Sequence, residues 1–248
     1  GFFMLRTILF FPAVGIPLVV SLLFTIKINY LNKKGETKKA DILTYKISSW
    51  WAKVVMKCAG AKINVKGLEN IPKDKTVLVM ANHQSYFDIT LLMSELKFPK
   101  GFIAKKELES WFGVSVWMKK MHCVFMDRAN IRKSAESIVE GINLLKKGHS
   151  MVIFPEGTRS KGGICHEFKA GSFKLATKSN VLLVPVTIDG TYNLREANEK
   201  KRIKGASVDL IIHKPINVAT LSKEEIAELP KKVEKIITGS INPNRSRF

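Results

Sequence analysis

A histidine and a carboxylate stand five residues apart in the stretch NHQSYFD, residues 82–88, where His83 is followed by Asp88. The stretch comes directly after an apolar run, VLVMA at 77–81, which has the composition of a buried strand. Functional residues of α/β sheets gather at the carboxyl ends of strands. The pair is therefore placed where an imidazole held by a carboxylate could act as a general base.

Residues five apart on a regular helix point about 140° away from each other. His83 must therefore precede the following helix if its ring is to meet Asp88. Ser85 is a suitable N-cap, which puts Asp88 in the first turn, where the helix dipole favours a carboxylate. Asp88 could then hold one ring nitrogen of His83 and leave the other free to take a proton. Ser85-x-x-Asp88 is also a capping box, so the alternative is that Asp88 serves only the helix.

The sequence offers no protein nucleophile and no metal to work with this pair. No serine or cysteine stands in a GxSxG setting. If His83 is a base, the substrate therefore supplies the nucleophile. No second histidine or cysteine lies at ligand spacing from His83, so the sequence predicts no metal site.

A second stretch that could bind substrate is FPEGTRS, residues 154–160, which follows another apolar run. Gly157 permits a tight turn, and Thr158 and Arg159 project from the same loop. The planar fork of donors on an arginine suits a phosphate, and Glu156 could hold a substrate hydroxyl or pair with an arginine. The alternative is a surface turn with an ion pair.

Further cations follow two other predicted strands. Lys105 and Lys106 end the stretch FIAKK, and Arg128 follows VFMD. Because the carboxyl ends of parallel strands share one edge of a sheet, these side chains would lie along the edge that holds His83 and Arg159. Each alone would be read as a solvated surface charge. Together they predict an anionic, phosphate-bearing substrate.

From residue 62 onwards, short apolar runs alternate with helical patterns. Several runs are apolar throughout, as in strands that are covered on both faces. The pattern predicts an α/β fold with a mixed sheet of about seven strands flanked by helices. The predicted strands are 62–66, 76–81, 101–104, 123–126, 150–154, 181–188 and 206–213, and the predicted helices are 85–96, 111–120, 130–147, 171–179 and 222–238.

The first part of the chain predicts a membrane-associated helical segment at 1–61, ahead of the α/β domain at 62–248. From residue 7 to 26 the sequence has no charge, and these 20 residues are about the length that crosses a hydrocarbon core. Pro12 and Pro17 would kink a helix here, so the segment could span the membrane or dip into one leaflet.

The following stretch, residues 41–61, places Trp50 and Trp51 on an apolar helix edged by lysines. Tryptophan and lysine in this arrangement suit a membrane interface. The alternative is an ordinary amphipathic helix packed on the folded domain.

The charge of the chain predicts an anionic partner. The 248 residues carry a formal net charge of +20, from 41 basic and 21 acidic side chains. This favours an anionic membrane, anionic substrates or nucleic acid. Nucleic-acid binding would not explain the uncharged leader, and no such binding motif is present, so nucleic acid is not expected as a partner. Basic residues after the apolar run favour the cytoplasmic face of the membrane.

These stretches, taken in order, resemble the glycerolipid acyltransferases. NHQSYFD resembles the NHx4D motif of that family, and FPEGTRS resembles its FPEGTRS motif. FIAKKEL, VFMDR and VPVTI resemble the intervening and later blocks, and the resemblance covers roughly residues 60–215. The EGTR form and the short chain are similar to the 1-acylglycerol-3-phosphate acyltransferases within the family.

The resemblance implies direct acyl transfer at a membrane, without a cofactor or an acyl-enzyme. The donor would be acyl-CoA or acyl carrier protein, the acceptor the sn-2 hydroxyl of lysophosphatidic acid, and the product phosphatidic acid. Acylation of glycerol-3-phosphate or of another lysolipid is the alternative within this class, and a membrane-bound lipid hydrolase is the alternative outside it.

The resemblance also assigns roles to the residues of the two motifs. His83 would take the proton of the hydroxyl, and Asp88 would hold its tautomer. Asn82 or backbone amides of the loop would stabilise the oxyanion. Glu156 would position the glycerol, in the loop that continues through Gly157 and Thr158. The substrate phosphate would be held by cations, namely Lys105, Arg128 and Arg159.

Overall fold

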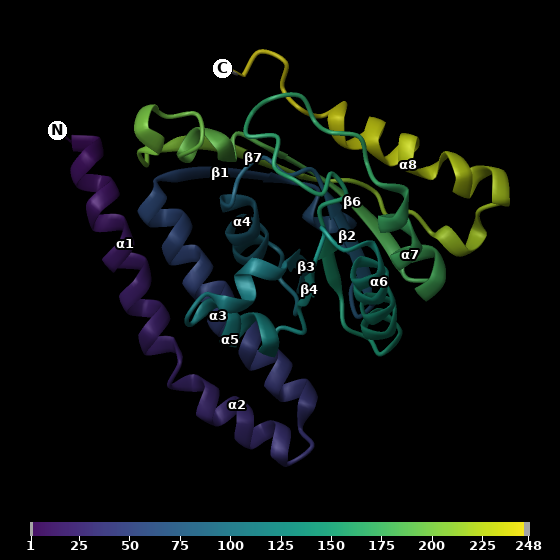
Figure 1. Cartoon of the computed structure of the whole chain (residues 1–248), viewed down its shortest axis with the longest axis horizontal. Helices are drawn as coiled ribbons and strands as arrows, with labels where there is room; N and C mark the ends of the chain where they lie inside the picture. The colour runs from purple at the N-terminus through teal and green to yellow at the C-terminus, as the bar shows by residue number, and fades with distance from the viewer. Residues whose placement is uncertain (1, 246–248) are drawn as a thin grey trace.

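Seven apolar stretches of the chain pair into one mixed sheet in the computed structural model, which describes residues 2–245 (Figure 1). The spatial order is β1-β7-β6-β2-β5-β3-β4, and every pair is parallel except β6 with β7. The predicted α/β class and the mixed seven-stranded sheet are confirmed. The strands are β1 (Ala61–Lys66), β2 (Val77–Ala81), β3 (Gly101–Lys105), β4 (Val124–Met126), β5 (Met151–Ile153), β6 (Leu182–Asp189) and β7 (Ala206–Ile212).

The central strand β2 is buried on both faces, which explains why its sequence is apolar throughout. Val77 and Val79 face one core cluster and Leu78 and Met80 face the other, because successive strand residues point to opposite sides. The first cluster is shared with α3 and α4, and the second with α6, α7 and α8. The helices of the body are α4 (Phe87–Glu95), α5 (Val114–Lys120), α6 (Ile131–Lys146), α7 (Lys174–Ser179) and α8 (Lys223–Thr238).

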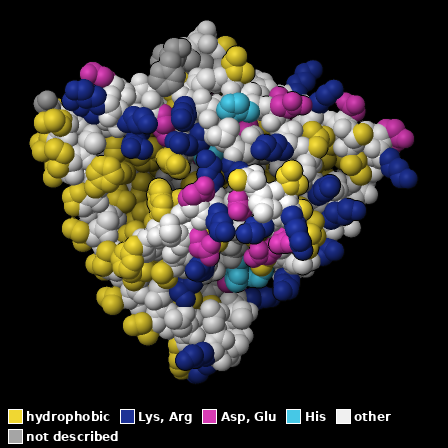
Figure 2. Space-filling model, viewed as in Figure 1, with side chains coloured by type: hydrophobic (Ala, Val, Ile, Leu, Met, Phe, Trp, Pro, Cys, Tyr) yellow, Lys and Arg dark blue, Asp and Glu magenta, His cyan; other side chains and the backbone are white. Residues whose placement is uncertain are grey.

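The N-terminal segment forms three helices, α1 (Phe2–Ser21), α2 (Phe24–Lys33) and α3 (Thr37–Ala59). Helix α1 continues through Pro12 and Pro17, and the break before α2 falls at Leu22 and Leu23. Within the described residues, the stretch Phe2–Lys33 is long and apolar enough to cross a membrane, by length and composition. Figure 2 shows its apolar side chains gathered on one side of the molecule, over α1.

Helix α3 contacts both the folded domain and α1. Ala52 and Val55 are buried in the same cluster as Leu91 of α4, and the Trp51 Nε1 donates a 3.0 Å hydrogen bond to the Val14 carbonyl oxygen of α1. Only Trp50 of the two tryptophans is largely exposed. One face of the helix therefore packs on the folded domain, while the interfacial role of its exposed face and the division at residue 61 stay predictions.

Gly101, the first residue of β3, lies against the chain that leads into β4. A Cβ atom on this residue would come within 2.6 Å of the His122 carbonyl oxygen and 2.7 Å of that of Met121. Because both neighbours are backbone, we expect Gly101→Ala to lower the free energy of unfolding by about 1–3 kcal/mol. Chemical denaturation in detergent measures this. Gly171→Ala is the matched control, since no atom lies within 4 Å of its added Cβ; equal losses in the two variants would contradict the packing argument.

Candidate active site

The two sequence motifs meet at one edge of the sheet. β2 and β5 are parallel neighbours, so the loops that follow their carboxyl ends lie side by side. The backbone N–H of Ser160 donates a 2.8 Å hydrogen bond to the His83 carbonyl oxygen, which ties one loop to the other. β6 pairs with β2 on its other side and brings the chain around Thr191 to the same edge.

His83 and Asp88 form a buried pair at this edge. The His83 Nδ1 lies 2.7 Å from the Asp88 Oδ2, and Asp88 is fully buried. Because a carboxylate only accepts, Nδ1 carries the proton and Nε2 is the basic nitrogen. Among the residues that the structure describes, none forms a hydrogen bond with Nε2. The arrangement leaves one imidazole nitrogen able to take a proton from a bound molecule.

Asp88 also performs the capping role that the sequence left as its alternative. Its Oδ2 accepts from the backbone N–H groups of Gln84 at 2.6 Å and Ser85 at 3.0 Å. Its Oδ1 accepts from the Thr191 hydroxyl at 2.5 Å. The Ser85 hydroxyl in turn accepts from the N–H of Phe87, at the start of α4, at 3.1 Å. One carboxylate therefore orders the loop, the helix start and the imidazole together.

Glu156 supports His83 from the neighbouring loop. Its Oε1 accepts from the His83 backbone N–H at 2.7 Å, and its Oε2 accepts from the His166 backbone N–H at 2.8 Å. Burial raises the pKa of Glu156, and the hydrogen bonds from His83 and His166 act in the opposite direction. Both carboxylate oxygens are engaged inside the protein. The structure therefore places Glu156 beneath the loop, where it positions His83, and not in the open position expected for contact with glycerol.

The ring of His83 is fixed by stacking as well as by hydrogen bonds. Its centroid lies 4.1 Å from that of Phe154, with an angle of 17° between the planes.

Gly157, two residues after Pro155, has a φ of +77°, and the Lys169 side chain packs where its Cβ would be. Thr158 is exposed at the tip of the loop.

Arg159 is bound to the first motif through a residue that the sequence analysis missed. Its Nη1 lies 3.1 Å from the Glu196 Oε1, and its guanidinium lies 3.7 Å above the Tyr86 ring. The Glu196 carboxylate also accepts from the Ser85 hydroxyl at 2.8 Å. Glu196 follows β6 in an irregular segment rich in charged residues, where no spacing marks it as special.

Arg128 is held at the same edge of the sheet with an unused donor. β3 pairs with β5 and β4 with β3, so Lys105 and Arg128, which follow those strands, lie further along the edge from His83. Burial lowers the pKa of Arg128, and the Glu107 carboxylate acts in the opposite direction. Among the described residues, the Arg128 Nη1 is the one fully buried side-chain nitrogen or oxygen atom without a hydrogen-bond partner. Such a donor matches an anionic oxygen.

Asn82 holds the ends of two strands together. Its Nδ2 donates to the Ile188 carbonyl oxygen and its Oδ1 accepts from the Ile188 N–H, both at 2.8 Å. The side chain is buried. The structure therefore places Asn82 as support for the loop, and its amide is engaged with β6 instead of facing an oxyanion position.

An apolar cavity of about 390 Å³ lies between the N-terminal helices and α4. Its wall residue Phe102 stacks on Phe154 at 6.5 Å between centroids, and Phe154 stacks on His83. Through Phe102 the cavity therefore borders the aromatic residues that stack on the His83 imidazole. Its lining includes side chains of four helices and β3, among them Phe10, Trp51, Phe87, Phe102, Trp117 and Met118.

Comparison with known proteins agrees with this geometry. The family model described as Acyltransferase matches residues 62–189, which hold both motif loops. The chain belongs to the acyltransferase family. A 1-acyl-sn-glycerol-3-phosphate acyltransferase of Borreliella burgdorferi is 37% identical over 180 residues, 73% of this chain and 69% of that protein.

Two further relatives of this acyltransferase differ in length. The chloroplastic 1-acyl-sn-glycerol-3-phosphate acyltransferase LPAT1 of Arabidopsis thaliana is 40% identical over 63% of this chain, which spans 44% of that longer protein. The crystal structure of PlsC, the 1-acyl-sn-glycerophosphate (LPA) acyltransferase of Thermotoga maritima, has a TM-score of 0.72 and 32% identity. That comparison covers 89% of this chain and 94% of the other.

Thr191 contacts Asp88 and does not contact the His83 imidazole. Substitution of Thr191 therefore tests whether its hydroxyl, which follows β6, positions the Asp88 carboxylate for acyl transfer. We expect Thr191→Val to lower kcat about 10-fold, because one hydrogen bond to a buried charge, about 1.5–3 kcal/mol, is lost. Thr191→Ser keeps the hydroxyl and is the control, with kcat near that of the wild type. Equal kcat values for Thr191→Val and Thr191→Ser would contradict this role.

Proposed function

We propose that the chain transfers a fatty acyl group from an acyl thioester to the sn-2 hydroxyl of lysophosphatidic acid, giving phosphatidic acid. The observation that carries this proposal is the buried His83–Asp88 pair, with Nε2 as its free basic nitrogen. Neither partner of the pair is a nucleophile in this arrangement. The acceptor hydroxyl therefore supplies the attacking oxygen.

In the proposed step, His83 Nε2 takes the proton of the sn-2 hydroxyl as the oxygen attacks the thioester carbonyl carbon. The carbonyl oxygen becomes an oxyanion, which then collapses as the carbon–sulfur bond breaks. The thiolate leaves and receives the proton from the imidazolium of His83. Asp88 stabilises that imidazolium through Nδ1. A base of this kind contributes about 10²–10⁴ in rate.

Cationic side chains at the same edge support a phosphate-bearing acceptor. The unpartnered Nη1 of Arg128 is buried, so an anionic oxygen would satisfy it. Arg159 is already oriented by Glu196 and Tyr86, and Lys105 is half-buried at the end of β3. In this proposal Arg128 and Lys105 bind the phosphate directly. Arg159, held by Glu196 and Tyr86, forms the wall of the site next to His83.

The apolar cavity beside the pair supports a long-chain substrate. A volume of about 390 Å³ lies in the range of small-molecule sites, and its lining is almost wholly apolar. Because α1 both lines this cavity and exposes its outer apolar face, we propose that the enzyme works at a membrane surface. The donor thioester is acyl-CoA or acyl carrier protein, and the basic surface suits either.

The first test compares the wild type with His83→Ala, using a long-chain acyl thioester and lysophosphatidate. We expect phosphatidate from the wild type and a loss of about 10²–10⁴ in kcat in the variant, because the base is removed. His213→Gln, which removes an imidazole that bonds Thr187 on β6, is the control and retains activity. Equal activity of wild type and His83→Ala would overturn the role of His83.

The same assay separates the two alternatives. If the wild type acylates glycerol-3-phosphate or another lysolipid and not lysophosphatidate, the acceptor assignment falls while acyl transfer stands. If labelled thioester is hydrolysed at the same rate with and without acceptor, the chain is a hydrolase and the transfer proposal falls.

Arg128 provides a test of phosphate binding that is separate from proton transfer. We expect Arg128→Gln to raise KM for lysophosphatidate about 10- to 100-fold, since a charge-assisted hydrogen bond contributes about 1.5–3 kcal/mol, and to leave KM for the thioester unchanged. Arg132→Gln is the matched control, because Arg132 is an exposed arginine paired with Glu136 on α6. A change in the thioester KM alone would reassign Arg128 to the donor.

A further inference from the structure

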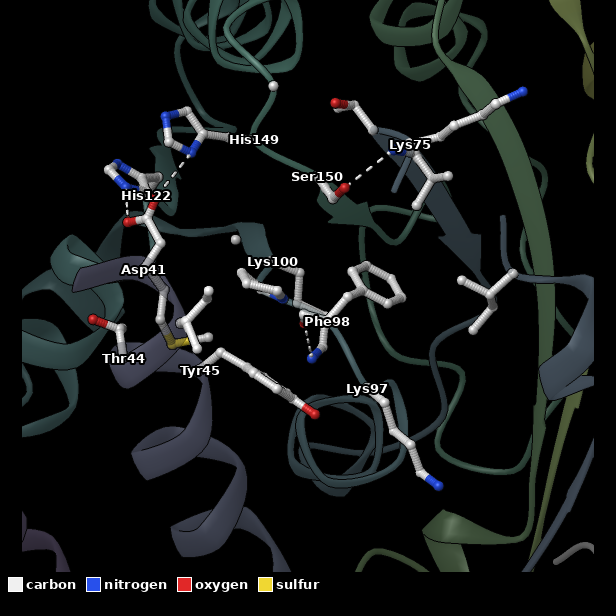
Figure 3. Close-up of a pocket in the computed structure, with 18 of the residues that line it drawn as sticks. Asp41, Thr44, Tyr45, Lys75, Lys97, Phe98, Lys100, His122, His149 and Ser150 are labelled. Atoms are coloured by element: carbon white, nitrogen blue, oxygen red, sulfur yellow. Dashed lines mark hydrogen bonds and ion pairs between the residues drawn. The ribbon is translucent and has the colours of Figure 1, made fainter. Parts of the chain in front are cut away.

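A second cavity, of about 750 Å³, lies at the opposite end of the sheet from His83 (Figure 3). It is lined by Val77 and Gly101, the first residues of β2 and β3, and by Ser150, just ahead of β5. These are the amino ends of parallel strands, whereas both motif loops follow carboxyl ends. The mechanism proposed above uses no residue of this cavity.

Three metal-ligating side chains converge at one side of this cavity. Asp41 comes from α3, His122 from the turn between α5 and β4, and His149 from the loop before β5. The His122 Nε2 lies 2.9 Å from the Asp41 Oδ1, and the His149 Nδ1 lies 3.8 Å from the Asp41 Oδ2. Figure 3 shows both imidazoles beside the one carboxylate.

The spacing of the three groups suits a single metal ion. The candidate ligand atoms all lie within 4.8 Å of one another. Bonds of about 2.0–2.2 Å from zinc to nitrogen and oxygen would require distances of roughly 3.3–3.6 Å between ligand atoms in a tetrahedron. The pairs with Asp41 at 2.9 and 3.8 Å bracket that range, so small side-chain rotations would complete the geometry.

The two imidazoles lie against each other as well as against Asp41. The rings of His122 and His149 are 3.9 Å apart between centroids, with an angle of 34° between the planes. Both rings therefore approach the one carboxylate from the same side of the cavity. His122 also has a φ of +60°, an uncommon conformation that fixes the position of its ring.

We propose that Asp41, His122 and His149 form a binding site for one divalent transition-metal ion of the zinc class. Two imidazoles and one carboxylate leave a fourth position, and the cavity offers space for it. The bound ion would join α3 of the N-terminal segment to two loops of the sheet.

The test uses the full chain in detergent, stripped with a chelator and titrated with Co²⁺ and Zn²⁺. Co²⁺ reports tetrahedral nitrogen and oxygen ligation through its visible absorption, and a chromophoric chelator in competition gives the zinc affinity. We expect one ion per chain in the wild type. Asp41→Asn, His122→Asn and His149→Asn should each weaken binding more than about 100-fold, beyond the loss typical of outer-shell changes. Asparagine also tolerates the φ of residue 122.

His213→Asn is the matched control for loss of a histidine, and its affinity should equal that of the wild type. Circular dichroism and the melting temperature of the metal-free variants establish that each is folded. Zinc should raise the melting temperature of the wild type and of His213→Asn, and not that of the three ligand variants. Binding that is absent in the wild type, or equal in the wild type and in folded Asp41→Asn, would overturn the site and leave a hydrogen-bonded cluster.

Discussion

The buried carboxylate of Asp88 is the interaction on which the catalytic edge depends. A charge removed from water is tolerated only when its hydrogen bonds are satisfied, and here four donors point at it. Three of the donors belong to the loop after β2, and the fourth, Thr191, belongs to the chain after β6. Satisfying this one group therefore fixes the loop, the start of α4 and the tautomer of His83 at the same time.

Glu156 repeats this arrangement from the other motif. Its two oxygens accept from the His83 and His166 backbone N–H groups and contact the His166 ring, so the acid of the FPEGTRS motif is also internal support. Both carboxylates are therefore engaged inside the protein, and Nε2 of His83 is left without a hydrogen-bond partner among the described residues. In the proposed reaction, Asp88 compensates the positive charge that develops on the ring when Nε2 takes a proton.

The elements that sequence reasoning predicted well are those whose signal is local. β2 is apolar throughout because both of its faces are covered, and the two motif loops directly follow β2 and β5. What it missed depends on distant partners. Thr191 lies 103 residues from Asp88, and Glu196 lies 111 residues from Ser85. The packing of Trp51 against α1 was not visible in the sequence either, because periodicity identifies an apolar face without identifying what covers it.

The same reasoning explains why the three residues Asp41, His122 and His149 were invisible in the sequence. Metal motifs are recognised by short spacings, whereas these ligands come from a helix and two loops that only the parallel sheet brings together.

The sheet thus has two chemically distinct ends. At the carboxyl ends of its strands, buried carboxylates orient a base, and at the amino ends a carboxylate joins two imidazoles. Helix α3 takes part in both, since Trp51 lines the apolar cavity near His83 and Asp41 lies at the other end. Any ligand that fixes Asp41 therefore acts on the helix that also lines the proposed acyl site.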